Sequence, residues 1–132
     1  MMGKNEQQDE LEWEKVQVSN LLFNFPFNTS LAGFSMLTEA ITLSLGINKR
    51  SVNMTKDVYS KIAKRRNING NSVEKGIKSA IESVYTSTIS IKDIVCPNMV
   101  VRNALIDGKP KHFIMAICEV IKFSKLKLSA TN

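Results

Sequence analysis

Apolar residues recur at three- or four-residue spacing along most of the chain, a pattern typical of α-helices with one buried face. The pattern predicts a first helix from Asp9 to Phe25, which Pro26 ends because proline lacks a backbone N–H. It predicts a second helix from Leu31 to Leu45, capped by one of the polar residues 28–30. A last helix is predicted from Pro110 to about Lys125, since proline suits a first helical turn.

Residues 1–8 are polar, and we expect a disordered tail there, followed by a single helical domain over 9–128. Within that domain, residues 89–95 are expected to form a short helix. Residues 99–106 are rich in β-branched side chains and end in Asp107-Gly108, which is typical of a short strand or hairpin. An isolated strand, however, has no evident partner in this chain.

Residues 55–85, TKDVYSKIAKRRNINGNSVEKGIKSAIESVY, show two short helical stripes separated by a polar break. Asn67-Ile68-Asn69-Gly70 forms the break, because Asn and Gly tolerate the left-handed backbone of a tight turn. The second helix is predicted over 71–85, with Asn71 as its cap and Glu74 completing a capping box. Two short helices joined by a turn are typical of a helix-turn-helix, whose second helix enters the DNA major groove. A solvated helical hairpin fits the same pattern.

The charge of the chain supports the DNA-binding interpretation. The net charge is +6 and the pI is about 9.4, so polyanions such as nucleic acid or an anionic membrane surface are the expected partners. Between Lys49 and Lys78 the sequence holds nine Lys or Arg against two acids. No apolar run reaches the roughly 18 to 20 residues of a membrane span, and no signal peptide is evident. We therefore expect a cytoplasmic protein without a membrane partner.

The candidate site residues follow from the chemistry of DNA. Base edges require small hydrogen-bonding or charged side chains near the start of the second helix, and phosphates require cations around it. The base-reading candidates are Asn71, Ser72, Glu74, Lys75 and Lys78. The phosphate-contacting candidates are Lys49, Arg50, Lys56, Lys64, Arg65 and Arg66.

The sequence offers little for enzyme chemistry. Cys96 and Cys118 could form a disulfide, but we expect two free, buried thiols in a reducing compartment. Together with His112 they lack the spacing of a zinc site. Asp107 and Glu119 flank His112, but nothing positions a nucleophile beside them. No glycine-rich phosphate loop is present. We therefore expect no catalytic residues, no metal, no cofactor and no small-molecule substrate.

Several segments are similar to one family. Gly33-Phe34 with Leu37-Thr38-Glu39-Ala40-Ile41 matches a GYxYLREAI segment, and Thr55-Lys56, Tyr59 and Ile62-Ala63-Lys64-Arg65 match TKxLYPxIAKK. Val73-Glu74-Lys75, Ile77-Lys78 and Ala80-Ile81-Glu82 match SRVERAIRHAIE, and Lys109-Pro110 with Phe113-Ile114 echoes KPxNxEFI. The chain thereby resembles the C-terminal DNA-binding effector domain of the sporulation master response regulator of spore-forming Firmicutes, the stage 0 protein A family. The resemblance runs without a gap from Gly33 to Tyr85.

This resemblance implies an all-α bundle of about six helices containing a helix-turn-helix, with a recognition helix in the major groove. It implies that domains pair on tandem sites. By position, Glu74 and Lys75 take base-contacting places, Lys78 a DNA-facing place and Lys56 a phosphate-contacting place.

The departures from the family pattern bear on the target. Ser72 and Lys75 replace two arginines. Arginine reads guanine through a bidentate fork, which lysine reproduces poorly and serine not at all. The family's DNA box is therefore not carried over to this chain. Ser79 replaces a histidine, and Gly76 replaces an alanine at a cost of about 1 kcal/mol in helix propensity. No receiver domain is recognised, so we expect no switching by phosphorylation within this chain.

Two functions are consistent with these features. The first is a DNA-binding transcription regulator that uses helix 71–85. The alternative is a degenerate relative without a receiver domain, which acts by pairing with a full-length regulator through its apolar final helix. The substitutions at Ser72 and Lys75 favour the alternative, and the clustered cations favour DNA binding.

Overall fold

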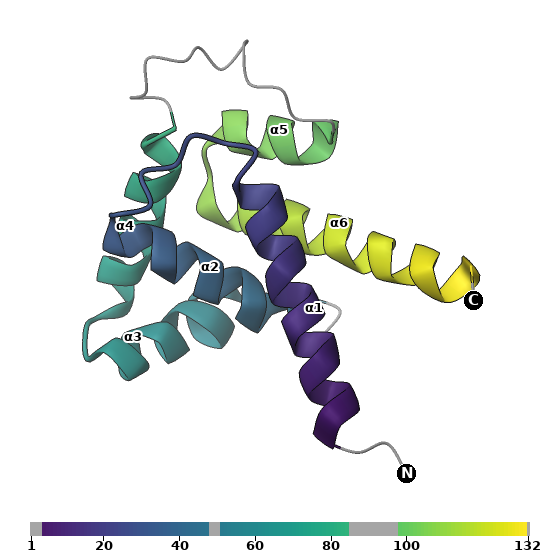
Figure 1. The fold of residues 1–132 in the computed structure, drawn as a ribbon. Helices are drawn as coiled ribbons and strands as arrows, with labels where there is room; N and C mark the ends of the chain where they lie inside the picture. The colour runs from purple at the N-terminus through teal and green to yellow at the C-terminus, as the bar shows by residue number, and fades with distance from the viewer. Residues whose placement is uncertain (1–3, 48–50, 85–97, 132) are drawn as a thin grey trace.

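The computed structural model describes residues 4–47, 51–84 and 98–131. Its elements in order are α1 (Lys4–Leu22), α2 (Ala32–Leu45), η1 (Met54–Tyr59), α3 (Ser60–Arg66), α4 (Gly70–Glu82), α5 (Met99–Asp107) and α6 (Pro110–Thr131). η1 is a π-helical segment that continues directly into α3. These described ranges hold helices and no strand, so the all-α class predicted from the sequence is confirmed (Figure 1).

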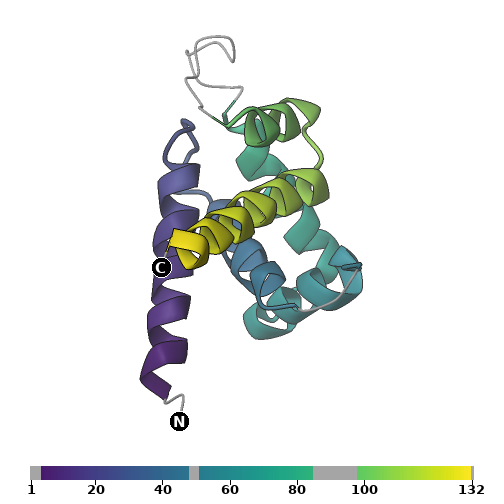
Figure 2. The ribbon, with the colours of Figure 1, turned by 90° about the vertical axis from the view of Figure 1, so that its right-hand side faces the viewer.

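Helix α2 is the centre of the packing. It contacts α1, α3, α4, α6 and η1. Leu37, Ala40 and Ile41 of α2 are fully buried, and Phe113 and Ile117 of α6 pack into the same core. Each fully buried Leu, Ile or Phe contributes roughly 1.5–3 kcal/mol to folding. Figures 1 and 2 show α6 crossing α1, with α4 on the other side of α2.

The crossing of α2 and α4 is unusually close because two glycines face each other there. A Cβ added at Gly33 would lie 1.8 Å from the carbonyl oxygen of Gly76. A Cβ at Gly76 would lie 2.3 Å from Cε of Met36. Gly76 therefore contributes to packing, which the helix-propensity argument alone did not reveal. The contact fixes the position of α4 on α2.

The first helix differs from its predicted bounds at both ends. α1 begins at Lys4, inside the expected tail 1–8, because Lys, Glu and Gln favour helix. It ends at Leu22, before the predicted Phe25, and the side-chain amide of Asn24 donates to the carbonyl oxygens of Asn20 and Leu21 at 3.3 Å. Trp13 is partly buried and packs against the core.

The start of α2 also differs from the prediction. Its N-cap is Leu31, which makes no side-chain capping bond, so the expected cap from residues 28–30 is wrong. Asn28 instead accepts hydrogen bonds from the N–H and the hydroxyl of Ser30 at 3.1 and 2.6 Å. The N–H of Asn28 donates to Oγ of Ser83 at 3.0 Å, which ties the α1–α2 loop to the end of α4. Gly46 is the C-cap of α2.

The segment expected to form a strand is helix α5. Asn98 caps it by accepting from the N–H groups of Val100 and Val101 at 3.0 and 3.1 Å, and Gly108 ends it with a φ of 77°. Two strong end signals and the burial of Val101 and Leu105 outweigh the β-branched composition. The short helix predicted over 89–95 lies outside the described residues.

Candidate nucleic-acid interface

The first half of the predicted helix-turn-helix is the continuous helical segment η1–α3. Asn53 caps it, since its Oδ1 accepts from the N–H of Lys56 at 3.1 Å. In return, Oδ2 of Asp57 accepts from the N–H of Asn53 at 2.9 Å. This reciprocal pair satisfies N–H groups that a helix start leaves open. It places Lys56 in an exposed position in the first turn.

The turn between α3 and α4 uses two asparagines. Asn67 has a φ of 56°, the left-handed conformation that the sequence predicted for this break. Asn69 caps α4: its Oδ1 accepts from the N–H of Ser72 at 2.8 Å and from its hydroxyl at 3.0 Å. The predicted capping box of Asn71 and Glu74 is therefore wrong, because an asparagine two positions earlier already fills that role. α4 starts at Gly70 and leaves the side chains of Asn71 and Glu74 exposed.

Helix α4 has sharply different inner and outer faces. Its inner face is buried, and the residues on it are Val73, Ile77, Ala80 and Ile81. The base-reading candidates are all exposed on the outer side; they are Asn71, Ser72, Glu74, Lys75 and Lys78. Among the described residues, neither Lys75 nor Lys78 forms an ion pair. The core thus holds α4 firmly while these polar groups face outward.

A groove of about 620 Å³ runs beside the outer face of α4. Thr55 and Tyr59 of η1 form one wall, Glu74 and Lys78 of α4 another, and residues 106–111 of the α5–α6 turn close it. Two exposed lysines, Lys109 before α6 and Lys111 in its first turn, thus line the same groove as Lys78. The site prediction missed both lysines, although the Lys109-Pro110 motif in the family resemblance pointed to this segment.

Tyr59 lies between this groove and the core. It is only 3% exposed, and burial, followed by the nearby carboxylate of Glu74, raises the pKa of its phenol above the ordinary value. Tyr59 and Glu74 line the same groove.

The two arginines at the end of α3 are already engaged. Nη1 of Arg65 lies 3.1 Å from Oε1 of Glu39, and Nη2 of Arg66 lies 3.2 Å from Oε2. Arg66 also donates from Nη2 to Oγ of Ser35 at 2.9 Å. Both cations thus join α3 to α2 across their shared flank. Lys56 and Lys64 are exposed, and the candidates Lys49 and Arg50 lie outside the described residues.

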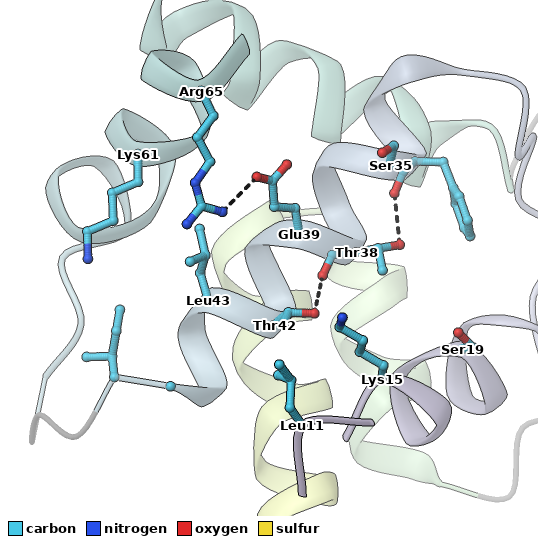
Figure 3. Close-up of a pocket in the computed structure, with 13 residues that line it drawn as sticks. Leu11, Lys15, Ser19, Ser35, Thr38, Glu39, Thr42, Leu43, Lys61 and Arg65 are labelled. Atoms are coloured by element: carbon cyan, nitrogen blue, oxygen red, sulfur yellow. Dashed lines mark hydrogen bonds and ion pairs between the residues drawn. The ribbon is translucent and has the colours of Figure 1, made fainter. Parts of the chain in front are cut away.

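A second groove, of about 900 Å³, lies over α2 between α1 and α3 (Figure 3). Lys15 of α1 and Lys61 and Arg65 of α3 stand at its sides, and Leu11 and Leu43 give it apolar walls. The hydroxyls of Thr38 and Thr42 in α2 donate to carbonyl oxygens one turn earlier. These polar groups are satisfied within α2, and none of the base-reading candidates lines this groove.

The residues considered for enzyme chemistry have structural positions. Nδ1 of His112 lies 2.7 Å from Oδ2 of Asp107, which links the end of α5 to the start of α6 at the surface. Cys118 is buried; its thiol donates to the carbonyl oxygen of Ile41 at 3.7 Å, and burial raises its pKa to about 12. Cys96 lies outside the described residues. No helix in the described part of the chain is long and apolar enough to cross a membrane.

An all-helical domain whose core holds one helix with polar and charged side chains outward is typical of helical DNA-binding domains. The profile of the family described as Sporulation initiation factor Spo0A C terminal matches residues 18–121. The chain therefore belongs to this family, the DNA-binding effector domains of a transcription regulator of sporulation. No curated protein and no solved structure matched the chain significantly.

Proposed function

We propose that this chain is a sequence-selective DNA-binding module of a transcription regulator, with α4 as its recognition helix in the major groove. The observation that supports this most strongly is the arrangement of α4. Its inner face is locked into the core, whereas Glu74, Lys75 and Lys78 are exposed together on the outside. A packed helix that presents charged side chains at one side suits base reading.

Phosphate contacts would come from both sides of α4. Lys56 and Lys64 lie on η1 and α3, and Lys109 and Lys111 on the α5–α6 turn add a second flank. Arg65 and Arg66 are the weaker phosphate ligands of the predicted set, because Glu39 already neutralises part of their charge. Lys49 and Arg50 complete the set on sequence grounds alone. A duplex held on two flanks places its major groove over α4.

Base reading would differ from that of relatives with arginine at these places. The hydroxyl of Ser72 hydrogen-bonds to Asn69, which leaves it a limited role in reading bases. Lys75 offers one point charge in place of a planar fork. Each bidentate contact is worth about 1–3 kcal/mol of discrimination between bases. Without those contacts, Asn71, Glu74, Lys75 and Lys78 would together supply the sequence selectivity. Two copies would bind neighbouring half-sites on the DNA. The protein would act in the cytoplasm.

The alternative is pairing with a full-length regulator without DNA contact. The exposed lysines argue against it, because Lys75 and Lys78 have no ion-pair partner among the described residues and no packing role. A chain that acts only by protein contact has no need of two exposed lysines without an ion-pair partner on this helix. The family to which the chain belongs is regulatory, which also favours DNA binding over enzyme chemistry.

The test is to select bound sequences from a random duplex pool with the purified chain at low salt, and then to titrate salt. We expect enrichment of a defined motif. The logarithm of affinity should fall with that of salt by about 0.9 for each phosphate neutralised. Lys122→Ala is the control and should leave DNA affinity unchanged. Lys122 of α6 interacts electrostatically with Glu14 of α1 and does not line the groove beside α4. If the chain bound no duplex at low salt but bound a full-length relative tightly, the alternative would be established.

A further inference from the structure

The groove over α2 is separate from the groove beside α4. It measures about 900 Å³ and lies between α1 and α3, each of which packs against α2 (Figure 3). The two grooves share no lining residue. A molecule bound over α2 would therefore leave the outer face of α4 free to contact other molecules.

Four apolar side chains line the groove over α2 without being fully buried. Leu11 of α1 is 41% exposed. Phe34, Leu43 and Ile47 are only partly buried, although they pack against the core. Covering these side chains would remove apolar surface from water, which is the main driving force of most protein association. The groove therefore favours an occupant with an apolar face.

Cations stand on both sides of this groove. Lys15 comes from α1, and Lys61 and Arg65 come from α3, as Figure 3 shows. Glu39 is the only acid among the described residues that line the groove, and it already binds Arg65 at 3.1 Å. Lys61 forms no ion pair with a described residue, and Lys15 has only an exposed contact of 4.0 Å with Glu12 on its own helix. Exposed contacts of that kind are weak, so each side of the groove offers a cation to an occupant.

An α-helix with an apolar stripe and acidic flanks complements both features. A helix lying between α1 and α3 would pack on these two helices and on α2 beneath it. Apolar side chains at every third or fourth position would cover Leu11 and Leu43. Acidic side chains beside that stripe would reach Lys15 on one side and Lys61 on the other. A small amphipathic anion such as a fatty acid carries its charge at one end and would meet the cations of one side alone.

We propose that the groove over α2 binds an amphipathic helix of a partner protein, one whose apolar stripe is flanked by acidic residues on both sides. This binding is independent of the proposed role of α4 as a recognition helix. Because the two grooves have no lining residue in common, the chain would bind the partner helix and a DNA duplex at the same time.

The test uses two synthetic helical peptides of about 18 residues that differ only in charge. The acidic peptide carries leucine at every third or fourth position, with glutamates on both sides of that stripe. The neutral peptide carries glutamines in place of the glutamates. Fluorescence anisotropy of each labelled peptide, titrated with the full chain, measures its affinity. We expect the acidic peptide to bind, and the neutral peptide to bind at least about tenfold more weakly.

Two matched pairs of variants locate the binding site. Leu11→Ser should weaken binding of the acidic peptide at least about fivefold. Val16→Ser should leave it unchanged, because Val16 is exposed on the same helix but does not line the groove. Lys61→Glu should weaken binding at least about tenfold, since it replaces attraction by repulsion. Lys64→Glu makes the same change of charge on α3 outside the groove, so its effect should be less than about twofold.

The far-UV circular dichroism of the four variants should match that of the parent chain, because all four side chains are exposed. The proposal would be overturned if neither peptide bound at about 100 μM chain, or if both bound equally well. Equal weakening by the two members of either pair would overturn it too. If dodecanoate bound in place of the peptide and Leu11→Ser abolished its binding, the occupant would be a small amphipathic anion, against the proposal. Leu11→Ser should bind the selected DNA site as well as the parent chain does, so failure here is distinct from failure of DNA binding.

Discussion

The pair of helices α3 and α4 has one side packed on α2 and one side open to solvent. Cationic side chains form ion pairs on the packed side and stay exposed on the open side. Arg65 and Arg66 on the packed side are held by Glu39, whose side chain is only 23% exposed. Lys75 and Lys78 on the open side are exposed, with no ion pair to any described residue. Gly76 contacts α2 one position from Lys75. Charge density alone therefore does not identify a DNA-binding surface; the acids on neighbouring helices decide which cations remain available.

The strongest test of the packed side is Gly33→Ala. The new Cβ would lie 1.8 Å from the carbonyl oxygen of Gly76, and backbone on both sides prevents local relief. We expect a loss of about 3 kcal/mol or more in the free energy of unfolding, at the upper end of overpacking effects. Denaturant unfolding followed by circular dichroism measures it.

Gly46→Ala is the control for this substitution. A Cβ at Gly46 would make ordinary contact at 3.5 Å with the carbonyl oxygen of Leu43. Its stability should change by less than about 1 kcal/mol. If Gly33→Ala were as stable as Gly46→Ala, the close crossing of α2 and α4 would be wrong, and with it the position of α4.

On the open side, Lys75→Ala is expected to weaken binding to the selected DNA site by about 1–3 kcal/mol while affecting random DNA less. Lys56→Ala should weaken both DNAs alike and reduce the salt slope by about 1. Fluorescence anisotropy with both duplexes over a salt series distinguishes these outcomes. If each substitution weakened both DNAs by the same amount, Lys75 would not read bases.

The comparison also shows what the sequence could predict. The apolar stripes of α2, α4 and α6 span several turns, so their existence and buried faces were predictable. The capping residue of α4 was not predictable, because Asn67, Asn69 and Asn71 are equally plausible caps from residue type. The structure selects Asn69, whose Oδ1 accepts from the N–H of Ser72. For α5, local composition favoured a strand, whereas Asn98 and Gly108 at its ends produce a helix.

The candidate site was predictable where it depends on one helix and not where it depends on several. The outward direction of Lys75 and Lys78 follows from the periodicity of α4. The pairing of Arg65 and Arg66 with Glu39 depends on how α3 crosses α2, which no local pattern reveals. That Lys109 and Lys78 line one groove likewise depends on how α5 and α6 pack beside α4, which no local pattern reveals.

Arg66→Ala and Lys64→Ala compare a cation that forms an ion pair with an exposed cation on the same helix. Arg66→Ala removes contacts to Glu39 and Ser35, and it should lower stability by about 0.5–1 kcal/mol because the pair is partly exposed. Lys64→Ala should leave stability unchanged and reduce the salt slope of DNA binding. Thermal unfolding and anisotropy of both variants measure the two effects. The reverse result would assign phosphate binding to Arg66.

Glu39→Gln tests the same pairing from the acid. It removes the charge that holds both arginines, so stability should fall by about 0.5–1 kcal/mol. Affinity for random DNA should rise, because two cations become available to phosphates. Glu119→Gln on α6 is the control, since Glu119 is exposed and forms no ion pair with a described residue. Unchanged affinity with lowered stability would confine the arginines to a structural role.

Gly76→Ala is expected to give the smallest effect, because two contributions oppose each other. Alanine gains about 1 kcal/mol of helix propensity over glycine. Its Cβ would lie 2.3 Å from Cε of Met36, so that flexible side-chain end must rotate away inside a packed core. A net change within about 0.5 kcal/mol is the expected outcome of unfolding measurements. Adding Met36→Ala removes the clash, so Gly76→Ala should be more favourable in that background than alone. If Gly76→Ala were equally costly in both backgrounds, contact with the α2 backbone rather than with Met36 would limit this position.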